Sequence, residues 1–167
     1  ALCADVGITQ RVHTKTHKTP EIARMQVAAG SQGITCQKLG EAEAMADAGL
    51  DDILVPYNIV GTRKLERLVA LARRARITVA ADSADTVRGV SQAAAAAGLS
   101  IPMLVEMDTG AHRCGVQTPA AVTLLAERIE AAEGVDFAGV MTYPSSTSAR
   151  AFINETMDSL ATVGMQA

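Results

Sequence analysis

The chain of 167 residues is 49% hydrophobic and 20% charged, which excludes disorder for its bulk because disordered chains contain few apolar residues. Its net charge of −3 argues against a surface for nucleic acid or an anionic membrane, and no apolar run approaches the length that spans a bilayer. Three cysteines are too few and too scattered for a disulfide framework or a structural zinc site, so we expect a cytoplasmic protein.

Short apolar runs alternate with longer amphipathic stretches along the chain. Five of these runs are rich in Val, Ile and Thr with little polar alternation, which is typical of strands buried on both faces of a parallel sheet. They are Gly33–Gln37, Asp52–Tyr57, Ile77–Asp82, Pro102–Glu106 and Phe137–Tyr143. An earlier segment, Arg11–His17, is too polar to be predicted as a strand from its pattern alone.

The stretches between these runs have the periodicity of amphipathic helices. They are Pro20–Ala29, Gly40–Ala48, Lys64–Arg74, Ala84–Ala97, Thr118–Ala132 and Ala149–Val163. Thr19 before Pro20 and Thr118 before Pro119 are predicted helix caps. Four helices are expected to end at a glycine in the left-handed conformation: Gly30, Gly49, Gly98 and Gly134.

This alternation predicts an α/β fold with a parallel sheet, either doubly wound or closed as a (β/α)8 barrel. The sequence has no G-x-G-x-x-G after its first strand and no phosphate-binding P-loop, which leaves the common doubly wound nucleotide sites unsupported. Polar residues instead follow almost every strand, which favours the active-site face of a barrel. They are Lys15, His17, Gln37, Tyr57, Asp82, Ser83, Glu106, Asp108 and Tyr143. A closed barrel needs eight units, whereas we count about six, so part of the barrel is absent or the sheet is open.

The densest polar cluster is the segment RVHTKTHK at positions 11–18. If it is extended, Arg11, His13, Lys15 and His17 fall on one face. Neighbouring cations disfavour the charged form of a lysine, which is what a lysine that forms a Schiff base requires. A solvated basic segment or a generic phosphate contact is the alternative.

The second segment with candidate chemistry is VEMDTGAHRCGV at positions 105–116, a buried strand followed by a loop bounded by glycines. Arg113 could bind an anionic oxygen with its planar guanidinium group. The alternative is an ordinary loop in which Arg113 pairs with Glu106 or Asp108. We expect His112 to be exposed to solvent, and the cysteines at 36 and 114 to be small buried hydrophobes.

Six segments follow one another in the order RVHTKTHK, PEIARMQVAAG, GITCQKLGEAEAMADAG, DDILVPY, EMDTGAHRCGV and FAGVMTY. Together they resemble the D-threonine aldolase and D-serine dehydratase group of the alanine-racemase-like, fold-type III pyridoxal-phosphate enzymes. The resemblance implies that Lys15 binds pyridoxal 5'-phosphate covalently and that Arg113 reaches its phenolic oxygen. It also implies that Tyr143, Gln37 and, less directly, His13 line the cofactor pocket.

The resemblance further implies an incomplete barrel of the alanine racemase N-terminal domain type over residues 1–167. Enzymes of this group carry two further strands, a glycine-rich phosphate loop and a C-terminal β-domain. That domain holds the ligands of a divalent metal (Mn, Mg or Zn), so we expect no metal ligand in this chain. Val12 stands where the group usually has proline, and Pro144-Ser145-Ser146 replaces a loop containing Gly and His.

The function that the resemblance implies is a metal-assisted lyase that cleaves D-3-hydroxy amino acids by a retro-aldol reaction, for example D-threonine to glycine and acetaldehyde. The alternatives are a D-serine or D-3-hydroxyaspartate dehydratase, an amino-acid racemase, and a non-catalytic carrier of pyridoxal phosphate. A doubly wound domain that binds another anion is a further alternative. The expected partners are a D-amino acid substrate and a second copy in a homodimer, with no nucleic acid and no membrane.

Overall fold

The computed structural model describes residues 2–147 and 149–167. Its centre is a six-stranded sheet in which every neighbouring pair is parallel and the spatial order follows the sequence. The strands are β1 (Val12–His13), β2 (Ile34–Thr35), β3 (Asp52–Val55), β4 (Arg76–Ala81), β5 (Ile101–Met107) and β6 (Val135–Thr142).

A helix follows each strand, and the six predicted helices are confirmed to within two residues at either end. The helices are α2 (Pro20–Ala28), α3 (Leu39–Asp47), α4 (Thr62–Ala72), α5 (Ala84–Ala96), α6 (Pro119–Glu130) and α7 (Ala149–Thr162). A short helix that the pattern did not predict, α1 (Leu2–Asp5), precedes them. In the part of the chain that the structure describes, no helix is both long and apolar enough to cross a membrane.

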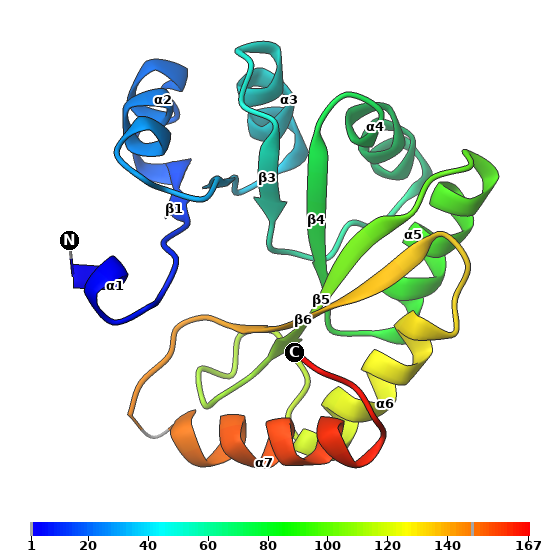
Figure 1. The fold of residues 1–167 in the computed structure, drawn as a ribbon. Helices are drawn as coiled ribbons and strands as arrows, with labels where there is room; N and C mark the ends of the chain where they lie inside the picture. The colour runs from blue at the N-terminus through cyan, green and yellow to red at the C-terminus, as the bar shows by residue number, and fades with distance from the viewer. Residues whose placement is uncertain (1, 148) are drawn as a thin grey trace.

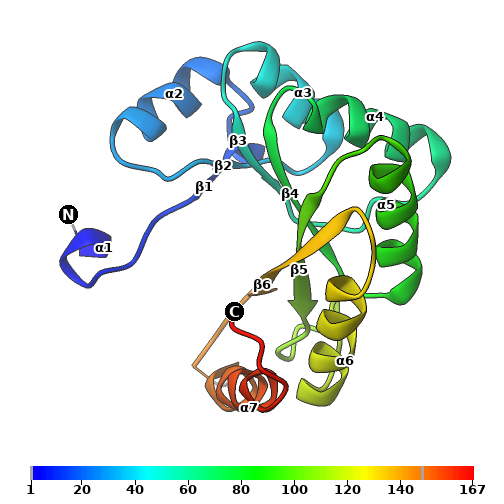
Figure 2. The same cartoon turned by 45° about the vertical axis from the view of Figure 1, so that its right-hand side comes forward.

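The strand order decides between the two α/β architectures. A doubly wound sheet reverses direction at a switch point, which places helices on both faces. Here the order β1 to β6 never reverses, so right-handed crossovers place the helices on one face of the sheet. Figures 1 and 2 show α2 to α6 following one another along the outer side of a curved sheet, with an opening between β1 and β6. The doubly wound alternative is therefore wrong, and the barrel-type arrangement of six βα units is confirmed.

The core lies between the strands and the surrounding helices. Alternate residues of β4, Ile77 and Val79, are buried in the same cluster as Leu68 of α4 and Val90 of α5. Because successive strand residues point to opposite faces, the other set points to the inner side of the arc. Burial of Ile77 and Val79 against the helices therefore leaves the alternate residues of β4 facing the inner side of the arc.

The polar segment 11–17 differs from its expectation in two ways. Val12 and His13 do form a strand, paired with Ile34 and Thr35 of β2. The backbone then turns into a 3-10 helix, Thr14–Thr16, so the extended conformation that would place all four side chains on one face is not present. His17 accordingly leaves the shared face, and its ring accepts a hydrogen bond from the Thr19 amide at 3.0 Å.

The helix boundaries confirm most of the predicted signals. All four predicted terminal glycines have positive φ, with values of 106°, 84°, 66° and 81° in chain order. The Thr118 hydroxyl accepts a hydrogen bond from the Ala121 amide at 3.2 Å, which caps α6. Thr19 occupies the predicted N-cap position of α2, with Pro20 in the first turn, but its hydroxyl donates to the His17 carbonyl and makes no side-chain cap bond.

Candidate active site

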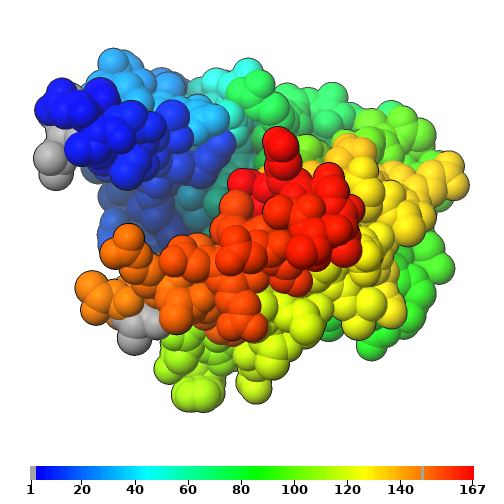
Figure 3. Space-filling model, turned by 60° about the horizontal axis from the view of Figure 1, so that its bottom comes forward, coloured from blue at the N-terminus to red at the C-terminus, as the bar shows by residue number. Residues whose placement is uncertain are grey.

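A cavity of about 550 Å³ lies on the inner side of the arc, around the carboxyl ends of the strands. Figure 3 shows a hollow that separates the amino-terminal segment, in blue, from the segment before α7, in orange. All five predicted site residues line this cavity: His13, Lys15, Gln37, Arg113 and Tyr143. Side chains separated by up to 130 positions in the sequence therefore meet at one place.

Two cations approach the ring of Tyr143, which stands directly after β6. The Lys15 Nζ atom lies 4.9 Å from the ring centroid and the Arg113 Cζ atom lies 5.0 Å from it. The negative face of an aromatic ring attracts both charges, so Tyr143 reduces the cost of holding them near each other. The tyrosine is 52% exposed, which leaves its ring accessible from the cavity.

Lys15 owes its position to the turn after β1. The Lys15 amide donates a hydrogen bond to His13 Nδ1 at 3.3 Å, so the neutral imidazole carries its proton on Nε2. Burial of the ring, and next the charge of Lys15, hold the pKa of His13 below its ordinary value, although Glu41 and the Thr35 backbone oppose this shift. His13 is therefore held as a neutral ring beside the lysine.

The glutamate at the start of α3 links two segments of the cavity wall. The Glu41 carboxylate accepts a hydrogen bond from the Gln37 amide at 2.9 Å and forms an ion pair with Lys18 at 2.9 Å. Burial alone would raise the pKa of Glu41, but these contacts outweigh it and lower the pKa. The ion pair ties the turn that carries Lys15 to the end of β2.

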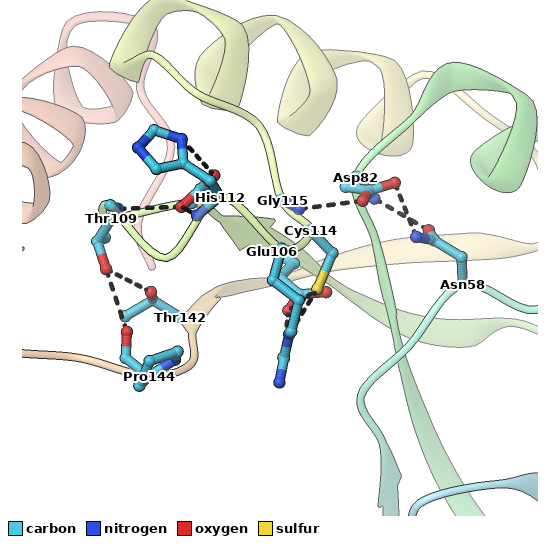
Figure 4. A network of polar contacts seen from close by, with 12 residues as sticks. Asn58, Asp82, Glu106, Thr109, His112, Cys114, Gly115, Thr142 and Pro144 are labelled. Carbon is cyan, nitrogen blue, oxygen red and sulfur yellow. Dashed lines mark hydrogen bonds and ion pairs between the residues drawn. The ribbon is translucent and has the colours of Figure 1, made fainter.

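Arg113 forms an ion pair with the buried carboxylate of Glu106. Its Nη2 atom lies 3.5 Å from Glu106 Oε1, and Glu106 is only 1% exposed. The Cys114 thiol donates to the same oxygen at 3.1 Å and accepts from Arg113 Nε at 3.3 Å (Figure 4). The pairing with Glu106 that we considered as an alternative is present, yet the guanidinium group still lines the cavity.

The loop that bears Arg113 is closed by hydrogen bonds at its base. The Asp108 amide donates to the Val116 carbonyl at 2.9 Å, and the Val116 amide donates to the Glu106 carbonyl at 2.9 Å. The Asp108 carboxylate accepts from the Gly110 and His112 amides at 3.0 Å each, and these bonds lower its pKa. The loop is therefore a fixed turn, in contrast to the mobile connection that its glycines alone allow.

The remaining candidate residues have no place in the cavity. Cys36 is fully buried, and burial raises the pKa of its thiol to about 11, so the thiol is the dominant form near neutral pH. His112 is exposed, with 84% of its side chain accessible, as expected. Five of the polar residues that follow strands do not line the cavity: His17, Asp82, Ser83, Glu106 and Asp108. Ser83 instead caps α5 by accepting from the Thr86 amide.

Sequence reasoning missed several residues that line the cavity. They are Thr35, Leu54, Pro56, Met141 and Thr142. Cys114 also lines the cavity and is only partly buried, so the expectation of a buried residue is wrong there. Thr35 and Met141 stand two positions before Gln37 and Tyr143, so the period of two in a strand places each on the same face as a predicted residue. Applying this period to Gln37 and Tyr143 would have found Thr35 and Met141, whereas it does not lead to Leu54, Pro56 or Thr142.

No cluster of three or more His, Cys, Asp or Glu side chains that could hold a metal ion exists among residues 2–147 and 149–167. The carboxylates around the Arg113 loop are engaged by backbone amides, the guanidinium group and the thiol. The described residues therefore do not fit a metal site.

Comparisons with known proteins identify a family and several relatives of this chain. The model of the family described as alanine racemase, N-terminal domain, matches residues 10–166. A D-threonine aldolase of Arthrobacter sp. is 45% identical over 139 residues, which cover 83% of this chain and 37% of that protein. The crystal structure of D-threonine aldolase from Filomicrobium marinum superposes with a TM-score of 0.96 at 34% identity, covering 99% of this chain and 49% of that one.

A third relative has a different named activity. The structure of D-threo-3-hydroxyaspartate dehydratase from Delftia sp. HT23 superposes with a TM-score of 0.83 at 28% identity, covering 99% of this chain and 48% of that one. The chain thus spans about half of the solved chains that it matches, and 37% of the Arthrobacter aldolase.

Proposed function

Since the chain belongs to the alanine racemase N-terminal domain family, we propose that it forms the cofactor-binding barrel of a pyridoxal-phosphate-dependent lyase. The proposed reaction is the retro-aldol cleavage of a D-3-hydroxy amino acid, such as D-threonine to glycine and acetaldehyde. The observation that carries the proposal is the meeting of Lys15 and Arg113 at the ring of Tyr143 in one cavity. The relatives named D-threonine aldolase support the choice of reaction.

The residues of the cavity fit pyridoxal phosphate. The volume of about 550 Å³ lies within the usual range for small-molecule sites. A primary amine suits the aldehyde of the cofactor, a guanidinium group suits an anionic oxygen, and an aromatic face suits a planar ring. Lys15, Arg113 and Tyr143 supply these three groups.

Each residue has a proposed task in this site. Lys15 would hold the cofactor covalently through its amine, and Arg113 would bind its phenolic oxygen. When bound, pyridoxal phosphate supplies an electron sink for the charge left at Cα when a bond to that carbon breaks. His13 supports the Lys15 backbone by accepting a hydrogen bond from its amide, and its ring lines the cavity. Gln37 would contribute a polar side chain to the cavity wall.

Other parts of the expectation stay predictions. The divalent metal, the two further strands and the C-terminal β-domain would come from residues outside this chain. The homodimer, the cytoplasmic location and the absence of nucleic-acid and membrane partners also stay predictions.

An assay of three substrates sorts the possible reactions of the full-length protein. We expect D-threonine to give glycine and an aldehyde, and the Lys15→Met variant to give neither. Pyruvate from D-serine would identify a dehydratase, which the Delftia relative favours as the second candidate. Inversion of D-alanine would identify a racemase. No turnover of any substrate by a protein that binds pyridoxal phosphate would contradict the lyase proposal and support a carrier.

A further inference from the structure

A ring of hydrogen bonds joins three loops beside the cavity. Asn58 lies in the loop after β3, Asp82 directly follows β4, and Gly115 lies in the loop after β5. The Asn58 amide group donates to Asp82 Oδ1 at 2.8 Å, and the Asp82 backbone amide donates to Asn58 Oδ1 at 3.2 Å. The other carboxylate oxygen, Asp82 Oδ2, accepts from the Gly115 amide at 3.0 Å (Figure 4).

The bond to Gly115 bears directly on the loop that carries Arg113. Gly115 has a φ of +105°, and a Cβ atom there would lie 2.5 Å from the Asp108 nitrogen and from the Met107 carbonyl carbon. Its backbone therefore packs against the end of β5, with Asp82 on the amide. Gly115 is two residues from Arg113, and the intervening Cys114 contacts the guanidinium group.

The carboxylate of Asp82 has no other structural task among the contacts described. The neighbouring Ser83 caps α5, so Asp82 is not needed for that purpose. Asp82 also does not line the cavity, so it does not touch a molecule bound there. Its two oxygens are divided between Asn58, which orients it, and the loop of Arg113.

We propose that Asp82, oriented by Asn58, is a positioning residue that holds the Arg113 loop in the conformation that directs the guanidinium group into the cavity. The effect of Asp82 on pyridoxal phosphate binding rests on the proposed function, whereas its effect on the loop does not. Glu106 restrains the Arg113 side chain, while Asp82 restrains the backbone that carries it.

The hydrogen-bond donors and acceptors of Asn58, Asp82 and Gly115 suggest substitutions that break these bonds and one pair of substitutions that restores them. In Asp82→Asn, one acceptor becomes a donor, so any orientation of the two amides leaves a donor facing a donor at Gly115, at Asn58 or at the backbone of position 82. In Asn58→Asp, two carboxylates face each other. The double variant, which combines the two substitutions, restores all three bonds. The amide introduced at position 82 accepts from Gly115 through its oxygen and donates to the carboxylate introduced at position 58.

The experiment compares the full-length wild-type protein with these three variants and with Asp85→Asn. Asp85 lies three residues further on, is exposed and pairs with Arg88, so its substitution is a charge-matched control. The first measurement is the dissociation constant for pyridoxal phosphate, obtained by absorbance titration. The second is hydrogen exchange of the amides in residues 109–116. Circular dichroism checks that each variant is folded.

We expect each single substitution to weaken pyridoxal phosphate binding about tenfold, since one hydrogen bond to a charged group is lost. Exchange in residues 109–116 should become faster in both single variants. The double variant should return to within about twofold of the wild-type constant, and Asp85→Asn should not differ from the wild type. Unchanged affinity and exchange in folded single variants, or no recovery in the double variant, would overturn the proposal.

Failure of the proposed function would look different. If the wild-type protein does not bind pyridoxal phosphate, the cofactor assignment is wrong, and hydrogen exchange alone decides the role of Asp82. Faster exchange in the single variants with recovery in the double variant would then support positioning of the loop. Unchanged exchange would contradict it.

Discussion

At the scale of single residues, the site depends on how the chain holds two cations close together. Lys15 and Arg113 would repel each other, yet both lie about 5 Å from the centroid of the Tyr143 ring. Each contact of this kind is worth about 0.5–1 kcal/mol at an exposed site. The buried Glu106 adds a compensating negative charge behind Arg113.

Tyr143 should therefore act through its ring and not through its hydroxyl group. We expect Tyr143→Ala to weaken pyridoxal phosphate binding by about threefold to tenfold, because both cation contacts are lost. Tyr143→Phe should stay within about twofold of the wild type, since the aromatic face remains. Titration of the full-length proteins measures both constants. Equal losses in the two variants would show that the hydroxyl group matters instead.

His13 should respond to the charge of its neighbour. Because burial and Lys15 lower its pKa, Lys15→Met should raise that pKa part of the way toward its ordinary value, with the burial effect remaining. Nuclear magnetic resonance titration of the imidazole signals in the cofactor-free protein measures the change. The signal of His112, on the exposed loop, is the internal control. An unchanged His13 titration would contradict a charge interaction with Lys15.

The direction of this shift also fixes its effect on stability. A lowered pKa means that the folded state binds the proton less readily than the unfolded chain. The contribution of His13 to stability is therefore present above a pH of about 6.5 and is lost as the pH falls below that value.

At the scale of elements, side chains at the amino ends of the strands also form specific contacts. Asp52 at the start of β3 forms ion pairs with Arg11 at 2.7 Å and with Arg76 of β4 at 2.8 Å. Gly33 leaves the space that the Arg11 side chain occupies. A Cβ atom at Gly33 would collide with Arg11 Nη1 and would lie 2.7 Å from the Asp52 carbonyl oxygen.

Substitution of two glycines by alanine should change the stability of the fold in opposite directions. Gly33→Ala should destabilise the fold by about 1–3 kcal/mol, because the backbone oxygen of Asp52 cannot move away freely. Gly89→Ala, inside α5, places its Cβ atom 3.5 Å from Leu65 Cδ1 and should stabilise the helix by up to about 1 kcal/mol. Urea unfolding of the full-length variants measures both. A tolerated Gly33→Ala would contradict the packing described for Arg11.

The elements also show where sequence patterns succeed and fail. Long helices such as α5 and α6 bury a regular stripe, so their bounds could be predicted from periodicity, caps and glycines. The strand β1 has only two residues and a polar neighbourhood, so its pattern carries no signal. Its pairing with β2 is a tertiary effect, and a 3-10 turn directly after it carries Lys15.

At the scale of the whole molecule, the unbroken strand order brings one candidate residue after another to the same inner edge. The polar residues after the strands could be read from the sequence, and the five residues with assigned roles do line one cavity. The hydrogen bonds among Asn58, Asp82 and Gly115 could not, because they join three loops whose relative positions depend on the curvature of the sheet.

The central claim is that Lys15 is the residue that binds pyridoxal phosphate. Reduction of the full-length protein with borohydride in the presence of the cofactor, followed by mass spectrometry of its peptides, locates the covalent attachment. The account predicts that the phosphopyridoxyl group is found on Lys15, with the nearby Lys18 and Lys38 unmodified. Attachment to another lysine, or no attachment to any, would contradict it.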